Sequence, residues 1–227
     1  MDCDHIIKEL KKHSSKESVR GMERFGINPS RTLGVAIPIL RKLAKQIGRN
    51  HDLSLQLWST GIHEARILAS MIEEYDMVTE RQMEEWVGGF DSWDVCDQCC
   101  GNLFDKTKFV HKKIHEWSKR KEEYVKRASF AMIAWFAFHD RRAKDTEFIQ
   151  FLSIIKACST DERKYVKKAV NWALRQIGKR NIILNKEAIR ISLEIQKIPS
   201  TSARWISSDA LRELRGEAVK RKLNKLR

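Results

Sequence analysis

Two stretches of the chain open alike: YVKRASFAMIAW (124–135) and YVKKAVNWALRQ (165–176), which begin 41 residues apart. A third stretch, SARWISSDALREL (202–214), repeats the Ala-Leu-Arg triplet of the second one 37 positions later. In all three, apolar residues recur at the three- and four-residue spacing of a helix face. The sequence therefore predicts a helical unit that returns at roughly 40 residues.

The remaining sequence also predicts helices. The chain contains 10 Gly and 3 Pro, few breakers for its length, and no segment alternates apolar and polar residues with period two. The expected helices cover residues 2–13, 37–48, 52–61, 62–75, 79–90, 108–119, 122–139, 145–159, 161–180, 185–197 and 201–216. We predict an all-α protein whose HEAT-like repeats stack into a curved solenoid with a concave basic groove. An irregular helical bundle is the alternative.

Three of these helices carry end signals. Pro38 suits the first turn of the helix over 37–48, and Gly48 suits its end. Asp52 is expected to cap the next helix, and Thr79 with Gln82 resembles a capping box. Tryptophans on apolar stripes are expected in the core: Trp58, Trp86, Trp117, Trp135 and Trp205.

Composition indicates a folded, strongly basic protein. Its 227 residues suit a single domain over 1–227, with a basic C-terminal helix and tail from about residue 212. Lys and Arg number 44 against 30 Asp and Glu, a net charge of +14. Such a surplus favours a polyanionic partner, nucleic acid first and an anionic membrane second. A soluble protein that is merely basic is the alternative. No apolar run is long enough to span a membrane, and the N-terminus does not resemble a secretory signal.

The five cysteines are expected to be reduced thiols, because their number is odd and the chain is long enough for a core without disulfides. Cys96, Cys99 and Cys100 lie near one helix face, and His111 or His115 follows downstream. No second pair completes four ligands in a usual zinc arrangement. We therefore predict buried thiols, no metal site and no cofactor.

The segment SWDVCD (92–97) places an aromatic residue and acids within one helical turn. Trp93 and Asp97 share a helix face, and Asp94 is close to both. A structural interpretation is that Asp91 or Ser92 caps the helix and Trp93 belongs to the core. The internal repeat favours a functional one.

The repeat adds cations and a second tryptophan to this picture. Arg127 lies in the first repeated stretch, and Lys168, Trp172 and Arg175 share a face of the second. If the second helix of each repeat lines the concave surface, these side chains converge there with Trp93 and Asp97. Cations mixed with aromatic rings are typical of surfaces that hold nucleic acid.

Four segments together resemble the DNA alkylation repair (AlkD-like) glycosylases, a HEAT-like family. They are RFGINPSRTLGVAIPILRKLAK (24–45), SWDVCD (92–97), YVKRASF (124–130) and KKAVNWALRQIGK (167–179), in the family's order. The resemblance implies that Asp97 is the catalytic carboxylate. It implies that Trp93 and Trp172 are aromatic walls around the lesion nucleotide, and that Arg127 anchors a phosphate.

The resemblance also implies a wider set of DNA contacts: Arg127, Arg175, Lys168, Phe25 and Asp94. Phe25 stands where family members carry a tyrosine, so a hydroxyl is missing. Ser92 stands where some members carry another aromatic residue, so the wall is expected to be thinner. Asp94 is expected to support catalysis or to pair with an arginine.

The function implied is that of a DNA glycosylase, a hydrolase that excises cationic N3- and N7-alkylpurines from duplex DNA in base excision repair. We expect a cytoplasmic monomer that associates with the nucleoid when bound to DNA. Two alternatives stay open. One is a non-catalytic HEAT-repeat protein that recognises damaged or unusual DNA, and the other is a protein-interaction scaffold.

Overall fold

The structure, a computed structural model, describes residues 1–225, and within that range all regular elements are helical. The prediction of an all-α protein is confirmed. The chain forms two compact units, here called unit 1 (Met1–Phe109) and unit 2 (from Val110 onward).

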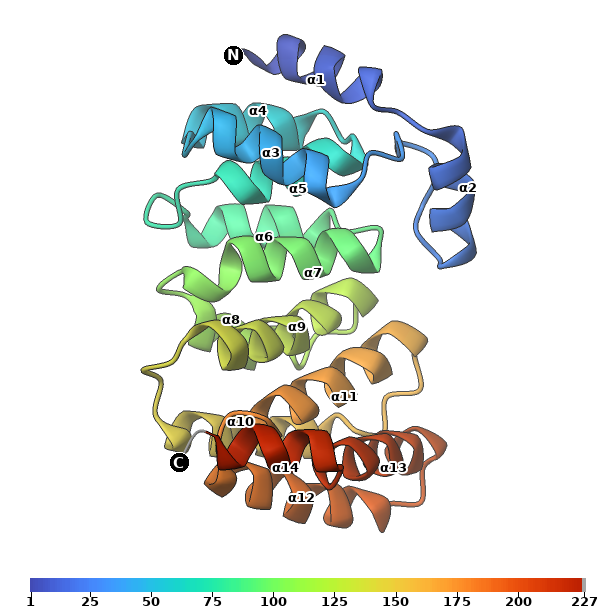
Figure 1. Cartoon of the computed structure of the whole chain (residues 1–227), viewed down its shortest axis with the longest axis vertical. Helices are drawn as coiled ribbons and strands as arrows, with labels where there is room; N and C mark the ends of the chain where they lie inside the picture. Colours follow the sequence, from blue (N-terminus) through green and yellow to red (C-terminus); the bar gives the residue numbers. More distant parts are fainter. Residues whose placement is uncertain (226–227) are drawn as a thin grey trace. The chain divides into compact units, whose positions relative to one another are not determined.

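Unit 1 contains seven α-helices and a 3-10 helix within the described residues (Figure 1). They are α1 (Cys3–Lys12), α2 (Lys16–Arg24), α3 (Ile37–Ile47), α4 (His51–Ser59), α5 (His63–Ile72), α6 (Glu80–Gly88), α7 (Trp93–Asn102) and η1 (Phe104–Lys106). Helix α5 packs against α3, α4 and α7, and eight of its residues are buried, so it is the central element of this unit.

Unit 2 has seven α-helices over the part that the structure describes. They are α8 (Val110–Trp117), α9 (Glu123–His139), α10 (Asp145–Ala157), α11 (Lys164–Gly178), α12 (Ile182–Gln196), α13 (Thr201–Leu214) and α14 (Glu217–Asn224). Helix α11 packs against both α9 and α13, and these three helices carry the related stretches of the sequence.

The internal repeat has a direct structural basis in unit 2. Tyr124 and Tyr165, which open the two related stretches, stack with ring centroids 5.8 Å apart. Further along, Asn171 Nδ2 on α11 donates to Asp209 Oδ2 on α13 at 2.7 Å, across 38 positions. Equivalent positions of successive helices therefore meet one another, as in a HEAT-like array.

The helix ends confirm some signals and correct others. Pro38 lies in the first turn of α3, and Gly48 follows its end with φ of +76°. The prediction that Asp52 caps α4 is wrong; the cap is Asn50, because its side chain accepts from Leu53 N at 3.0 Å. Only one half of the capping box at α6 is present. Thr79 Oγ1 accepts from Gln82 N, but the side chain of Gln82 donates through Nε2 to Glu73 and so does not complete the box.

The tryptophans expected in the core differ in burial. Trp86 and Trp117 are buried, whereas Trp58 and Trp135 are half-buried. Trp58 stacks on Trp86 with centroids 4.1 Å apart. The prediction is wrong for Trp205, which is 41% exposed on α13. Lys167 lies over its ring at 5.5 Å, so a cation covers part of this apolar surface.

Candidate functional site

The first turn of α7 presents the aromatic-acid motif of unit 1. Trp93 begins the helix and Asp97 follows one turn later, and both are partly exposed. Trp93 Nε1 donates to the carbonyl oxygen of Phe25 at 3.1 Å. The ring of Phe25 is 72% exposed. The structure therefore brings Phe25 and Trp93 together, and the indole has a fixed partner.

The backbone next to Phe25 is tied to the start of α7 by further hydrogen bonds. Asn28 N donates to Ser92 Oγ at 3.0 Å, and Asn28 Nδ2 donates to Asp91 Oδ2 at 3.0 Å. Ser92 is the N-cap residue of α7 and is fully buried. A side chain at position 92 thus packs inside unit 1 and contributes to this anchorage, not to an exposed aromatic wall.

Helix α5 supports both sides of this anchorage. His63 Nε2 lies 2.9 Å from Asp94 Oδ2, and His63 N donates to the carbonyl oxygen of Arg31 at 2.9 Å. The next residue, Glu64, accepts through its carboxylate from three consecutive backbone amides, Leu33 N, Gly34 N and Val35 N. Adjacent side chains at the start of one helix therefore fix segment 31–35 and the first turn of α7.

Gly34 is required where Glu64 receives these amides. Its φ is +79°, and a Cβ atom there would lie 2.3 Å from the carbonyl oxygen of Ser15. Any other residue would be strained and would clash with backbone. The Leu-Gly-Val segment is thus a tight turn that closes on a buried carboxylate.

The His63–Asp94 pair is almost enclosed. Burial, the largest influence, opposes the charged form of His63, but the hydrogen bond and the negative charge of Asp94 outweigh it. The pKa of His63 is therefore raised above its ordinary value. Asp94 Oδ1 is buried and has no hydrogen-bond partner among the described residues. The partner of Asp94 is thus a histidine, where an arginine was one of the expectations.

Sequence reasoning missed His63 and Glu64. A signal was present, because these two polar residues begin a segment that is otherwise largely apolar. Polar side chains in a buried helix are normally paired, so their partners are worth seeking. The partners themselves lie about 30 residues away in sequence, and spacing does not reveal them.

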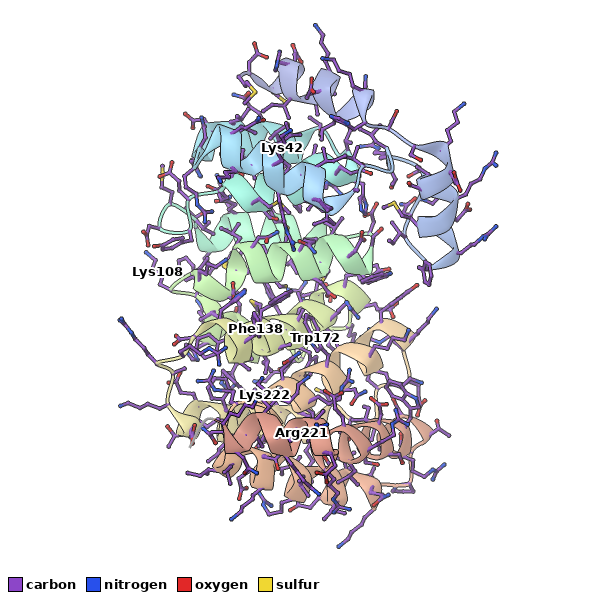
Figure 2. All side chains as sticks on the ribbon, viewed as in Figure 1. Lys42, Lys108, Phe138, Trp172, Arg221 and Lys222 are labelled. Atoms are coloured by element: carbon purple, nitrogen blue, oxygen red, sulfur yellow. The ribbon has the colours of Figure 1, made fainter. Side chains whose placement is uncertain are left out.

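In unit 2, Trp172 belongs to an aromatic cluster on α9 and α11. Its ring meets Trp135 edge-on, with centroids 5.5 Å apart and an interplanar angle of 84°. Trp135 also stacks on His139 at 5.1 Å. Phe138, which is 50% exposed, joins the cluster through Trp135, with ring centroids 6.1 Å apart; Figure 2 labels both Phe138 and Trp172. Lys168, one turn before Trp172, is exposed and has no carboxylate partner within residues 1–225.

The two predicted arginines are engaged within unit 2. Arg127 is 5% exposed, and its Nη1 donates to the carbonyl oxygen of Tyr165 at 2.6 Å. Arg175 Nη1 pairs with Glu213 and lies 3.5 Å from Asp209 Oδ2, both on α13. Both guanidinium groups therefore link neighbouring helices of the repeat. Lys168 is the predicted cation that is left facing solvent.

The cysteines near the motif are inert in this setting. Cys96, Cys99 and Cys100 are buried thiols. Burial is the main cause that raises the pKa of Cys99 and Cys100 well above the ordinary value. Among residues 1–225, no cluster of three or more His, Cys, Asp or Glu side chains is arranged to hold a metal ion. No described helix is long and apolar enough to cross a membrane.

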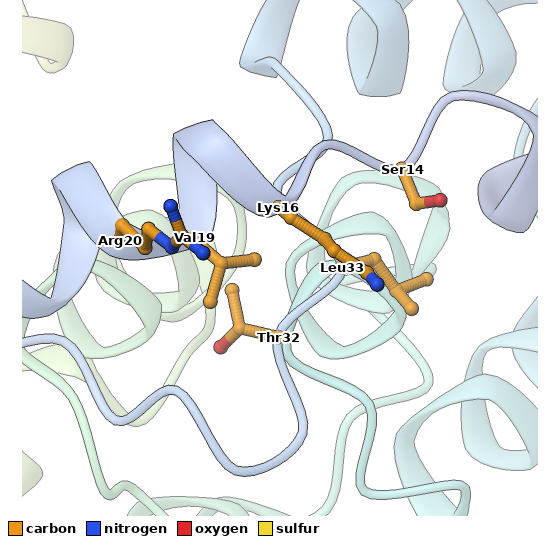
Figure 3. A pocket seen from close by; sticks show the side chains of 6 residues that line it. All are labelled: Ser14, Lys16, Val19, Arg20, Thr32 and Leu33. Carbon is orange, nitrogen blue, oxygen red and sulfur yellow. The ribbon is translucent and has the colours of Figure 1, made fainter.

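An open hollow of about 410 Å³ lies between α2 and the segment that follows it (Figure 3). Its lining residues are Ser14, Lys16, Val19, Arg20, Thr32 and Leu33. Neither Trp93 nor Asp97 is among its lining residues.

The helical repeats and the motif on α7 define an all-helical HEAT-like repeat protein. The family model described as DNA alkylation repair enzyme matches residues 6–214. The chain therefore belongs to the DNA alkylation repair enzyme family, and the resemblance inferred from sequence is confirmed.

Comparison with solved structures supports the same fold. One match is a structure from a family related to the HEAT-like repeat DNA glycosylases, with affinity for branched DNA structures. It is 17% identical, covers 93% of this chain and 95% of its own, and superposes with a TM-score of 0.79. A designed armadillo repeat protein bound to the peptide (KR)4 covers 82% of this chain and 79% of its own, with 16% identity and a TM-score of 0.38, too low to indicate a shared fold. A search of curated proteins finds no match.

Proposed function

We propose that this protein is a DNA glycosylase that excises positively charged N3- and N7-alkylpurines from duplex DNA. The observation that carries the proposal is the first turn of α7, where Asp97 lies one turn after a tryptophan whose indole is held by the Phe25 carbonyl. A carboxylate on a surface that binds DNA repels the phosphates, so its presence on a protein of net charge +14 requires an explanation. Catalysis at a centre that becomes positive supplies one.

The chemistry suits these residues. The bond between sugar C1′ and the purine nitrogen breaks, and its electron pair leaves with the alkylated base, which becomes neutral. No general acid is needed, because the base already carries the positive charge. Asp97 would stabilise the oxocarbenium-like sugar and orient the water that attacks C1′, and would accept its proton. The products are a free alkylpurine and an abasic site.

The aromatic and basic residues would bind the substrate. Trp93 offers a ring to the cationic nucleotide, and such a contact contributes about 0.5–2 kcal/mol. Trp172 is proposed as a second aromatic contact and Lys168 as a phosphate contact, because both reach the surface of unit 2. Arg127 and Arg175 are proposed to act mainly by holding α9, α11 and α13 in register. We propose that a monomer is sufficient.

The test is release of 7-methylguanine and 3-methyladenine from methylated duplex DNA. Wild type should release both bases, and Asp97→Asn should lower the rate at saturating protein by about a hundred-fold, since a preorganised charge is removed. Asp97→Asn should still bind the DNA. Glu85→Gln, which changes an exposed carboxylate on α6, is the control and should leave the rate unchanged. Release that survives Asp97→Asn would exclude Asp97 as the catalytic carboxylate.

A non-catalytic DNA-binding role is the second candidate. It is favoured by the structural match, which comes from a family with affinity for branched DNA structures. For this candidate, wild type binds branched DNA more tightly than intact duplex and releases no base. The acids of α7 would then be structural.

A further inference from the structure

An exposed aromatic ring lies beside a cation in unit 2, at a place that the proposed chemistry does not use. Phe138, near the end of α9, is 50% exposed. The guanidinium of Arg141 lies 5.9 Å from the centroid of its ring. Lys222, on α14, lies within electrostatic range of Arg141 and of Lys179. Figure 2 shows Phe138 on α9 and Lys222 on α14.

The backbone that carries Arg141 is firmly held. Asp140 Oδ1 accepts from Arg142 N at 2.8 Å and from Ala143 N at 2.9 Å, which closes a turn around residue 141. Arg180 Nη1 donates to the carbonyl oxygens of Ala137 and Asp140, both at 2.7 Å. The carbonyl groups at the end of α9 are thus already satisfied by Arg180, so Arg141 is not needed for that role.

Helix α14 holds Lys222 in a similar way. Val219 and Leu223 are buried and dock the helix, and Lys222 remains exposed beside them. Neither Lys222 nor Arg141 has a carboxylate partner within residues 1–225, whereas Lys179 pairs with Glu213 at 2.7 Å. Burial first, and then the charges of Lys179 and Arg141, lower the pKa of Lys222. The positive charges of Lys222 and Arg141 therefore act on each other, and an anion bound by both relieves that repulsion.

The combination indicates which anion. A free phosphate would need cations alone, and an exposed aromatic ring beside them adds nothing to its binding. Nucleic acid offers both a phosphate and the flat face of a base or sugar. In an intact duplex the base faces are stacked inside, whereas a flap or gap exposes them.

We propose that Phe138, Arg141 and Lys222 form an auxiliary DNA contact of unit 2, in which the cations hold a backbone phosphate and the ring of Phe138 stacks on an unpaired base. The inference rests on the proposed binding of DNA, but it does not depend on base excision. Its consequence is a preference for duplex DNA that carries a single-stranded flap or gap.

The experiment measures affinity of the full-length protein for an intact duplex and for the same duplex with a single-stranded flap. The double variant Arg141→Ala/Lys222→Ala should weaken binding to both DNAs by about ten-fold at about 0.1 M salt. It should also make the dependence of log affinity on log salt less steep by about 0.9 for each phosphate that is no longer neutralised. Lys220→Ala is the control, because this exposed lysine of α14 pairs with Glu217 at 2.8 Å.

Phe138 is tested separately. Phe138→Ala should weaken flap binding by about ten-fold, with an unchanged salt slope and little effect on the intact duplex, because the variant cannot stack on a base. Phe138→Trp should retain the preference, and Ile149→Ala, which removes another exposed apolar side chain of unit 2, should have no effect. Wild-type affinity and salt slope in the cation variant, or equally weakened binding of both DNAs by Phe138→Ala, would overturn the inference.

Failure of this inference is distinguishable from failure of the proposed function. The cation variant and Phe138→Ala leave α7 intact, so their binding data test the contact, whereas base release by wild type and by Asp97→Asn tests the glycosylase. If wild type binds flap DNA but releases no base, the glycosylase proposal fails. The binding data for the variants then still test the auxiliary DNA contact. If wild type binds neither DNA, both proposals fail.

Discussion

His63 and Asp94 form a buried pair that connects α5 to the turn carrying Trp93 and Asp97. The ring nitrogen and the carboxylate oxygen are 2.9 Å apart, and the histidine side chain is 4% exposed. Hydrogen bonds of this kind, between charged and buried groups, are stronger than neutral ones. His63 is therefore a positioning residue, since it acts on the first turn of α7 through Asp94.

Stability should depend on pH through His63. The groups that influence His63 are Asp94, Glu64 and Asp91, and its pKa is raised in the folded protein. A raised pKa means that the folded state binds the proton more tightly, so the stabilisation is complete below the unfolded pKa of about 6.5. It is lost as pH rises through the folded pKa. We expect His63→Gln to lower the free energy of unfolding by about 1–3 kcal/mol at about pH 6.

Urea unfolding at several pH values measures this effect. The difference in unfolding free energy between wild type and His63→Gln should narrow as pH rises through the folded pKa of His63, because the wild-type histidine then becomes neutral. The control is His5→Gln, which changes an exposed histidine of α1 and should show no such gap. A difference in unfolding free energy between wild type and His63→Gln that stays constant across the pH range would contradict a charged His63–Asp94 pair.

Sequence alone predicts part of this residue-scale picture. The four-residue spacing of Trp93 and Asp97 places them on one helix face, and the structure has both in α7. The partners that orient this turn are Phe25, Asn28 and His63, which lie 31 to 68 positions away from the residues they contact. Contacts over such distances depend on how helices pack, and periodicity contains no information about that.

At the scale of the helix, Gly178 allows the close approach of α11 to its neighbours. A Cβ atom at this position would lie 2.6 Å from Leu214 Cδ2 on α13 and 2.9 Å from Ala188 Cβ on α12. Leu214 can rotate, but the Cβ of Ala188 moves only with its backbone. Gly178→Ala should therefore destabilise the protein by about 1–2 kcal/mol, since overpacking outweighs the gain in helix propensity.

Thermal unfolding of Gly178→Ala and Gly88→Ala separates these two effects. Gly88 is the last residue of α6, and a Cβ atom there meets no heavy atom within 4 Å. Gly88→Ala should raise stability by about 0.5–1 kcal/mol through helix propensity alone. An equal gain in Gly178→Ala would show that the α11–α12–α13 packing is looser than the structure indicates.

Helices were predictable where an apolar stripe exists. The long helices α9, α11 and α13 match the expected ranges to within a few residues. Helices α11 and α13 bury one face, and α9 is buried along most of its length, including every residue from 127 to 134. Helix α2 was not predicted, and the reason is physical: its nine residues carry only two large apolar side chains, Val19 and Met22, and none of the nine is buried. Helix ends depend on single hydrogen bonds, which explains why Asn50 and not Asp52 caps α4.

At the scale of the whole molecule, the charge separates the two DNA-binding candidates from the protein-interaction scaffold. Many carboxylates are already engaged by nearby cations, for example Asp161 by Arg163 and Lys126, and Glu213 by Lys179. Despite burial, these hydrogen bonds and charges hold the pKa of Asp161 at about 2. The surplus of +14 is therefore carried by lysines and arginines such as Lys168, which are left for an external anion.

Affinity for an undamaged duplex should consequently fall steeply as salt rises. Each phosphate neutralised by a lysine or arginine releases condensed counterions, so six to ten contacts cost about 10³–10⁵-fold in affinity between about 50 and 200 mM salt. Fluorescence anisotropy of a labelled duplex over that range measures the slope.

The glycosylase and the non-catalytic DNA-binding protein both require this salt dependence, and base release then separates them. A protein-interaction scaffold predicts weak binding that does not change with salt, together with tolerance of Asp97→Asn. Salt-independent binding would therefore remove DNA as the partner and leave the acids of α7 with a purely structural role.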